Sequence, residues 1–191
     1  MHQNIFMTVF LAAALAAGSV SAQVKVVKNA GDKLGVDLSG VQAAGGAALA
    51  VRKTLELDLA RSGWLEPAAP GKGALAVRGT IAESGGQVVF NCQVVDAAGQ
   101  VHLNAAYAQP MANAIYAAHQ AANDIVLKTT GKPSFFLAKL VLIGTRGGSK
   151  ELYLADSSAQ DVRQLTQDRA GALKPRWSPD NRLISYTSFI K

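Results

Sequence analysis

Cysteine is nearly absent from this sequence, because Cys92 is the only one among 191 residues. An intramolecular disulfide is therefore excluded, and the fold must rest on a hydrophobic core even in an oxidising compartment. Apolar and polar residues alternate around Cys92, so that Val88, Phe90 and Val94 share one face of a strand with the thiol. We therefore expect a buried, unreactive thiol. Cys92 does not follow the apolar leader, so a lipid-anchored amino terminus is not indicated.

No block of like charge is present either. The sequence has 19 Lys and Arg against 13 Asp and Glu, a net charge of +6. Residues 23–140 carry 11 against 8 and residues 141–191 carry 8 against 5, which is an excess of +3 in each part. Nucleic-acid-binding proteins usually gather positive charge on one element. The even distribution therefore argues against a nucleic acid as a partner.

Long apolar runs are scarce, and the one present lies at the start of the chain. Residues 5–18 are apolar and are followed by four small residues, Ser19 to Ala22, which suit a signal-peptidase pocket. We predict a signal peptide over residues 1–22, cleavage between Ala22 and Gln23, and a periplasmic mature chain without stable membrane insertion. The leading residues contain no Lys or Arg, so an uncleaved anchor is the alternative.

The pattern of residues 23–133 predicts a small α/β domain. Alternating residues indicate strands, whereas apolar residues at three- and four-residue spacing, bounded by Gly or Pro, indicate helices. The expected strands are 23–28 (a short strand or an extended arm), 34–38, 74–82, 87–95 and 100–109, and the expected helices are 47–62 and 110–130. This order predicts a mixed sheet covered by two helices.

The pattern changes after a domain boundary that we place near Pro133. From residue 138 onward the sequence has only short strand candidates separated by turns, which is typical of an all-β unit. The expected strands are 140–145, 151–156, 162–166, 175–178 and 182–188. Residues 138–191 are therefore expected to form a second, all-β segment.

No residue pattern typical of catalysis or of cofactor binding is found. Gly71 to Ala76 matches a dinucleotide-binding string but opens a strand instead of a helix, and Gly147 to Lys150 has the character of a hairpin turn. His102 and His119 lack ligand spacing, and we expect His102 in solvent and His119 as a packing residue beside its helix's apolar stripe. We predict no enzyme, no metal site and no cofactor.

Two sets of residues carry a resemblance to a known family. Trp177-Ser178-Pro179-Asp180 resembles the blade repeat of TolB-type β-propellers, in which the Pro-Asp pair makes a tight turn. Segments 58–65, 77–79, 93–96 and 130–133 are similar in order and spacing to the amino-terminal domain of the TolB family. The resemblance covers nearly the whole mature chain. It implies a TolB-like amino-terminal domain over 23–133, followed over 138–191 by an incomplete β-propeller of about one blade.

The resemblance also implies a function. It points to a non-enzymatic periplasmic adaptor of the Tol–Pal system, which links inner-membrane Tol proteins to the peptidoglycan-associated lipoprotein and supports outer-membrane integrity and constriction at cell division. In the family the arm after the signal peptide engages TolA, and the lipoprotein binds the propeller, so that partner is expected only with a full propeller. The matching arm residues are Gln23, Val24, Lys25, Val26, Val27 and Lys28. The alternative is a periplasmic enzyme or ligand sensor that carries a TolB-like propeller fragment.

An incomplete propeller has a physical consequence. Propellers have about 4–8 blades, and repeat units need neighbours to cover their apolar faces. We therefore expect residues 24–132 to fold independently, and the tail to be loosely packed or self-associating and cut first by proteases. The tail residues expected to lack burial are Val141, Ile143, Leu152, Leu154, Trp177, Ile184 and Tyr186.

Overall fold

The computed structural model describes residues 33–190 of the chain. The predicted signal peptide (1–22), its cleavage site between Ala22 and Gln23 and the predicted arm (23–28) lie outside the described residues, and they stay predictions. Over the described part, no helix combines the length and the apolar character needed to cross a membrane.

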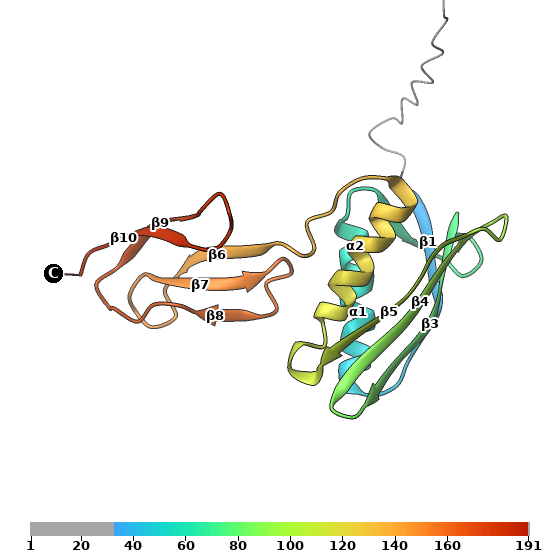
Figure 1. Cartoon of the computed structure of the whole chain (residues 1–191), viewed down its shortest axis with the longest axis horizontal. Helices are drawn as coiled ribbons and strands as arrows, with labels where there is room; N and C mark the ends of the chain where they lie inside the picture. Colours follow the sequence, from blue (N-terminus) through green and yellow to red (C-terminus); the bar gives the residue numbers. More distant parts are fainter. Residues whose placement is uncertain (1–32, 191) are drawn as a thin grey trace, which may run out of the picture. The chain divides into compact units, whose positions relative to one another are not determined.

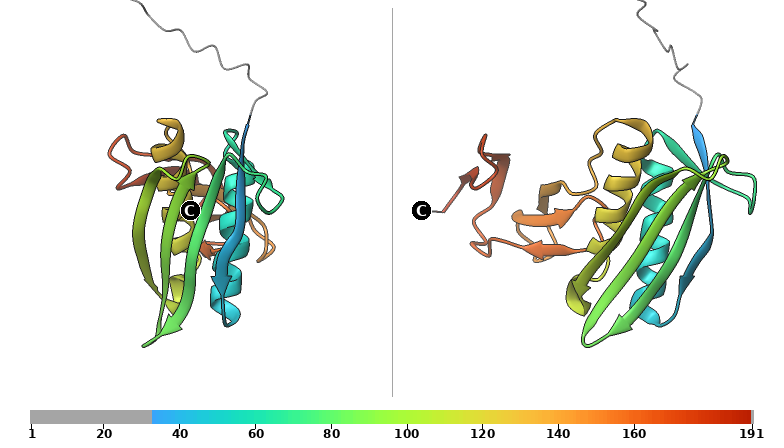
Figure 2. Two further views of the ribbon diagram at one scale, coloured as in Figure 1. Left: turned by 90° about the vertical axis from the view of Figure 1, so that its right-hand side faces the viewer. Right: turned by 45° about the vertical axis from the view of Figure 1, so that its right-hand side comes forward.

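The first part of the described chain is a five-stranded mixed sheet with two helices on one face (Figure 1). Its strands are β1 (Leu34–Ala43), β2 (Leu65–Ala68), β3 (Leu75–Ser84), β4 (Gln87–Asp96) and β5 (Val101–Pro110), in the order β2-β1-β3-β4-β5. Strand β1 is parallel to β2 and β3, whereas β3, β4 and β5 form an antiparallel meander. Figure 2 shows both helices behind this sheet, so the predicted mixed sheet covered by two helices is confirmed.

The first helix, α1 (Gly46–Arg61), packs through the apolar stripe predicted from its sequence. Val51, Leu55 and Leu59 are fully buried in the core between the helices and the sheet. The helix has no side-chain cap of its own at Gly45. Instead, the Glu83 carboxylate, at the end of β3, accepts the first free backbone N–H groups of the helix.

The second helix, α2 (Tyr116–Thr130), begins later than the predicted residue 110. Pro110 keeps an extended conformation at the end of β5, and the short 3-10 helix η1 (Met111–Asn113) precedes α2. Along its buried face α2 has the alanines 117, 118, 121 and 122, whose small side chains allow close packing. The helix ends at Gly131, where φ is 68° and the N–H donates to the Leu127 carbonyl, as a left-handed terminus requires.

Strand β4, between β3 and β5 in the sheet, confirms the predicted position of the cysteine. Cys92 is 2% exposed, and Val88, Phe90 and Val94 are buried on the same face. Burial raises the pKa of the Cys92 thiol to about 12, because a desolvated thiolate is unfavourable. The thiol is therefore held in its neutral form.

The second part of the described chain consists of two small antiparallel sheets. Strands β6 (Lys139–Gly144), β7 (Glu151–Asp156) and β8 (Val162–Gln164) form one sheet in the order β6-β7-β8, and β9 (Ala172–Trp177) pairs with β10 (Ile184–Ser188). Within residues 33–190 these strands do not close into a ring. The predicted fold class, an α/β domain followed by an incomplete all-β propeller segment, is confirmed.

One expectation about the second part is wrong. Leu152 is 2% exposed, although we expected it to lack burial. The reason is that β7 is the middle strand of its sheet, and β9 also contacts β6 and β7. Tyr186 on β10 is 39% exposed, as the prediction requires for a strand without a further neighbour.

Candidate functional site

A buried histidine joins the first part of the chain to the second. His119 on α2 is 1% exposed. Its Nδ1 lies 2.6 Å from the Asp58 carboxylate on α1, and its Nε2 lies 3.0 Å from the Asp156 carboxylate at the end of β7. We call these three residues the His119 clasp.

Local structure explains why each carboxylate reaches the ring. Asp58 follows Leu55 by three residues and precedes Leu59, so it lies on the buried face of α1 and is 2% exposed. Asp156 ends β7, and its other oxygen accepts the backbone N–H groups of the following turn at Gln160 and Asp161. The turn therefore fixes the direction of the Asp156 carboxylate.

The electrostatics of the clasp favour a charged ring. Burial acts to lower the pKa of His119, but hydrogen bonds and charge attraction from Asp58 and Asp156 outweigh it and raise the pKa above the usual 6.5. Burial acts to raise the pKa of Asp156, but hydrogen bonds from Ser158 and His119 hold it below its usual range. Both contacts of the clasp therefore favour the protonated form of His119.

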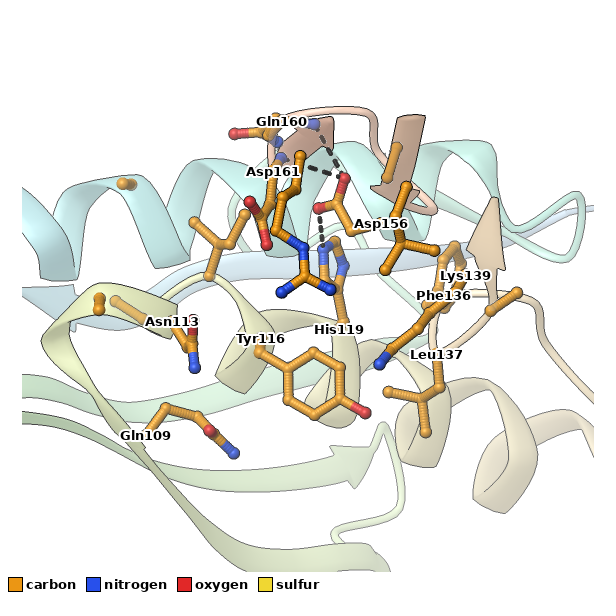
Figure 3. Close-up of a pocket in the computed structure, with 18 of the residues that line it drawn as sticks. Gln109, Asn113, Tyr116, His119, Phe136, Leu137, Lys139, Asp156, Gln160 and Asp161 are labelled. Carbon is orange, nitrogen blue, oxygen red and sulfur yellow. Dashed lines mark hydrogen bonds and ion pairs between the residues drawn. The ribbon is translucent and has the colours of Figure 1, made fainter. Parts of the chain in front are cut away.

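A groove of about 940 Å³ lies beside the clasp, and His119 and Asp156 form part of its wall (Figure 3). This volume is in the range of pockets for small ligands, roughly 300–1,000 Å³. Its wall comes from the connection between β5 and α2, the chain before β6, and the β7–β8 turn. Apolar and charged groups both contribute, among them Asn113, Tyr116, Phe136, Lys139, Asp161 and Arg163.

The groups that line this groove offer apolar, polar and charged contacts to a ligand. Both ring nitrogens of His119 face carboxylates, so neither is free to take a proton from a ligand. Among the described residues that line the groove there is no serine, threonine or cysteine. Within residues 33–190, no group of three His, Cys, Asp or Glu side chains is arranged to hold a metal ion.

The predicted propeller motif forms a turn outside the groove lining. Strand β9 ends at Trp177, and the Ser178 hydroxyl donates to the Asp180 carboxylate, whose pKa is lowered mainly by this bond. Asn181 adopts a left-handed conformation, with φ 57°, which asparagine tolerates better than most residues do. Trp177, Ser178, Pro179 and Asp180 therefore shape the β9–β10 connection. The predicted arm residues 23–28 lie outside the described residues and have no observed position.

The two histidines within residues 33–190 differ from the sequence-based expectations. His119 is buried as predicted, but it also contacts two carboxylates through its ring nitrogens and is not merely packed. His102 is half-buried instead of solvated, because the chain reverses after β4 and brings its ring to 3.0 Å from the Asp96 carboxylate. One signal in the sequence pointed to the clasp: Asp58 interrupts the apolar face of a helix, and a buried carboxylate needs a partner.

Comparison with known proteins finds relatives of this chain, in which an α/β domain is joined to a propeller-type segment. No protein-family model matches the chain. The chain is 36% identical over 118 residues to a TolB homolog of Chlorobium chlorochromatii, which covers 61% of this chain and 27% of the relative. It is 27% identical over 153 residues to the Tol-Pal system protein TolB of Aromatoleum aromaticum, which covers 80% of this chain and 30% of the relative.

The solved structure of TolB from Acinetobacter baumannii has the same fold. It aligns with a TM-score of 0.70 and 21% identity over 84% of this chain and 45% of that structure. The predicted resemblance to TolB is confirmed in sequence and in fold. The chain is similar to part of these TolB proteins, and it spans about 30% or less of the length of the two curated relatives above.

Proposed function

We propose that the chain acts as a non-enzymatic adaptor of the Tol–Pal type in the periplasm. The observation that carries the proposal is the combined match in sequence and fold: 36% identity to a TolB homolog and a TM-score of 0.70 to a solved TolB. The proposed role is to connect inner-membrane Tol proteins with the outer envelope, supporting envelope integrity and constriction at cell division.

The proposal requires export of the chain. Residues 5–18 are apolar, and Ala22 ends a run of small residues before Gln23. Osmotic-shock fractionation followed by amino-terminal sequencing is expected to give a periplasmic protein that begins at Gln23. Recovery of the uncleaved chain in the membrane pellet would contradict this part of the proposal.

The partner contact is proposed for the arm, residues 23–28. Val24 and Val26 alternate with Lys25 and Val27, a pattern that suits strand addition to an exposed sheet edge of TolA. Main-chain hydrogen bonds then supply affinity, and the two alternate valines fill pockets. Deletion of residues 23–28 is expected to abolish pull-down of TolA.

Two further variants separate strand addition from simple charge attraction. Replacing Val24 and Val26 by Asp is expected to weaken TolA binding strongly, because both pocket-filling side chains are lost. Replacing Lys25 and Lys28 by Gln serves as the control and is expected to change binding only slightly at physiological salt. Unchanged pull-down after deletion of the arm would exclude the proposed contact.

The division into residues 23–133 and 138–191 also belongs to this proposal. The second segment holds two small sheets instead of the several blades of a propeller. We therefore expect the chain by itself not to bind the peptidoglycan-associated lipoprotein, and limited proteolysis to cut after Pro133 before it cuts the first domain. Stable lipoprotein binding by the purified chain would show that a full propeller is not required.

A further inference from the structure

We propose that the His119 clasp is a pH-controlled latch: it holds the end of β7 against the two helices while His119 is protonated, and it releases β7 when the ring loses its proton. This inference concerns the chain's own conformation and does not depend on the proposed adaptor role. It rests on the three-residue geometry, on the different surroundings of the two carboxylates, and on the groove beside them.

The geometry of the clasp requires a proton on each of the two ring nitrogens of His119. An imidazolium has an N–H on each nitrogen, and each points to a carboxylate here, at 2.6 Å for Asp58 and 3.0 Å for Asp156. A neutral ring keeps only one N–H. After deprotonation one of the two carboxylates therefore faces a lone pair, which is repulsive in a site where His119 and Asp58 are almost fully buried.

The surroundings decide which contact breaks. Among the described residues, Asp58 has no hydrogen-bond partner other than His119. Asp156 also accepts from the Ser158 hydroxyl at 2.6 Å and from the Gln160 N–H at 2.9 Å, and its side chain is 14% exposed. Asp156 therefore keeps hydrogen-bond partners and contact with solvent when it separates from the ring, whereas Asp58 would keep none. The neutral ring is expected to keep its proton on Nδ1, toward Asp58, and the opening is expected between α2 and β7.

Other charged and titratable groups line the groove beside the clasp. They are Tyr116 on α2 with its ring edge-on to the imidazole, Lys139 on β6, Asp161 in the β7–β8 turn and Arg163 on β8. The two cations disfavour the imidazolium, and the carboxylate favours it. All three charges lie on the groove wall, and none of them makes a hydrogen bond or an ion pair with the ring. Solvent therefore screens them more than it screens the two carboxylates in direct contact.

The direction of the pH effect follows from the raised pKa of His119. The pKa of His119 in the closed state is higher than its ordinary value of 6.5, so protonation of the ring stabilises the closed state. This stabilisation is complete at pH values below 6.5. The stabilisation is lost as the pH rises through the raised value. Each unit by which the pKa of His119 is raised corresponds to a tenfold stronger preference of the closed state for the protonated ring. The latch is therefore closed in acidic solution and opens toward alkaline pH.

Opening also changes the groove. His119 and Asp156 form part of its wall, and the Gln160 amide reaches Thr54 on α1 across the same contact, at 3.4 Å. Separation of β7 from α2 would widen the groove on this side. A ligand that contacts both walls would bind the closed form, and a rise in pH would weaken its binding.

NMR on the full chain tests the latch without any variant. The ring nitrogens of His119 are followed from pH 5 to pH 10, with His102, which pairs with Asp96 in a half-exposed site, as the internal comparison. We expect a titration midpoint of His119 above 6.5 and a neutral ring protonated on Nδ1. A midpoint at or below 6.5, or a neutral ring protonated on Nε2, would overturn the proposal.

Pulsed electron paramagnetic resonance measures the opening itself, as a change in the distance between two spin labels. The labels are attached at Glu56→Cys on α1 and Leu165→Cys after β8, both exposed, while the native Cys92 stays buried. We expect one short, narrow distance distribution below the His119 midpoint and a longer or broader one above it. H119Q is expected to give the open distribution at every pH, and the matched variant H102Q to behave like the parent. A distribution that does not change with pH in the parent would overturn the latch.

Discussion

The start of α1 depends on a carboxylate from a distant strand, and this makes a sharp prediction. Glu83 lies at the end of β3, 36 residues after Ala47 in the chain. Its Oε1 accepts the Ala47 N–H at 2.8 Å and the Ala48 N–H at 3.2 Å. No carbonyl within the helix accepts from these backbone N–H groups. The negative charge of Glu83 also interacts favourably with the positive end of the helix dipole.

The size of the effect follows from these two bonds. Loss of a capping side chain costs about 1–2 kcal/mol, with the helix-dipole contribution included. E83A is therefore expected to lower the free energy of unfolding by about 1–2 kcal/mol, which corresponds to a drop in Tm of about 3–6 °C for a chain of this size. E83Q keeps an acceptor oxygen but not the charge, so about half of that loss is expected.

Thermal and urea unfolding followed by circular dichroism measures both variants against a matched control. Glu56 is an exposed glutamate on α1 itself, away from the helix start. E56A is expected to change stability by less than about 0.5 kcal/mol. If E83A and E56A lower Tm equally, Glu83 does not cap the helix in solution and the reasoning fails.

Three further predictions follow from buried contacts. Gly79 on β3 has φ 150°, and a Cβ there would collide with the Asn91 carbonyl, so G79A is expected to destabilise by about 2–4 kcal/mol in urea unfolding; a neutral effect would contradict this close approach. Cys92, with a pKa of about 12, is expected not to react with a thiol reagent at pH 8 until the protein unfolds, and rapid native reaction would refute its burial. Hydrogen bonds from Thr166 and the backbone hold the pKa of Glu151 below 4.5, so its stabilisation is present above that value and lost as the pH falls; Tm is expected to decline less between pH 6 and pH 3 in E151Q than in the parent, and parallel curves would contradict the assignment.

Elements with a strong local pattern were predictable from the sequence. Helix α1 follows from Val51, Leu55 and Leu59, and the buried face of β4 follows from the alternation around Cys92. Strand β2 was missed because its four residues include Pro67 and show no alternation of their own. Its conformation is set by parallel pairing with β1, which is a tertiary interaction.

The site was less predictable than the fold. His119 is 61 residues from Asp58 and 37 residues from Asp156 in the chain, and no local spacing connects them. Only the packing of α1, α2 and β7 brings the three side chains together. The sequence contained a hint, since Asp58 occupies the apolar face of a helix, but it did not identify which group would neutralise that carboxylate.

Crosslinking from the arm in living cells tests the central claim most directly. A photoreactive amino acid replaces Val26 in the exported chain, and the control places it at Leu49, which is exposed on α1. In cells that contain the complete Tol–Pal system, illumination is expected to give an adduct with TolA from position 26 and none from position 49. An exported, processed chain that gives no TolA adduct from position 26 would contradict the adaptor function proposed here.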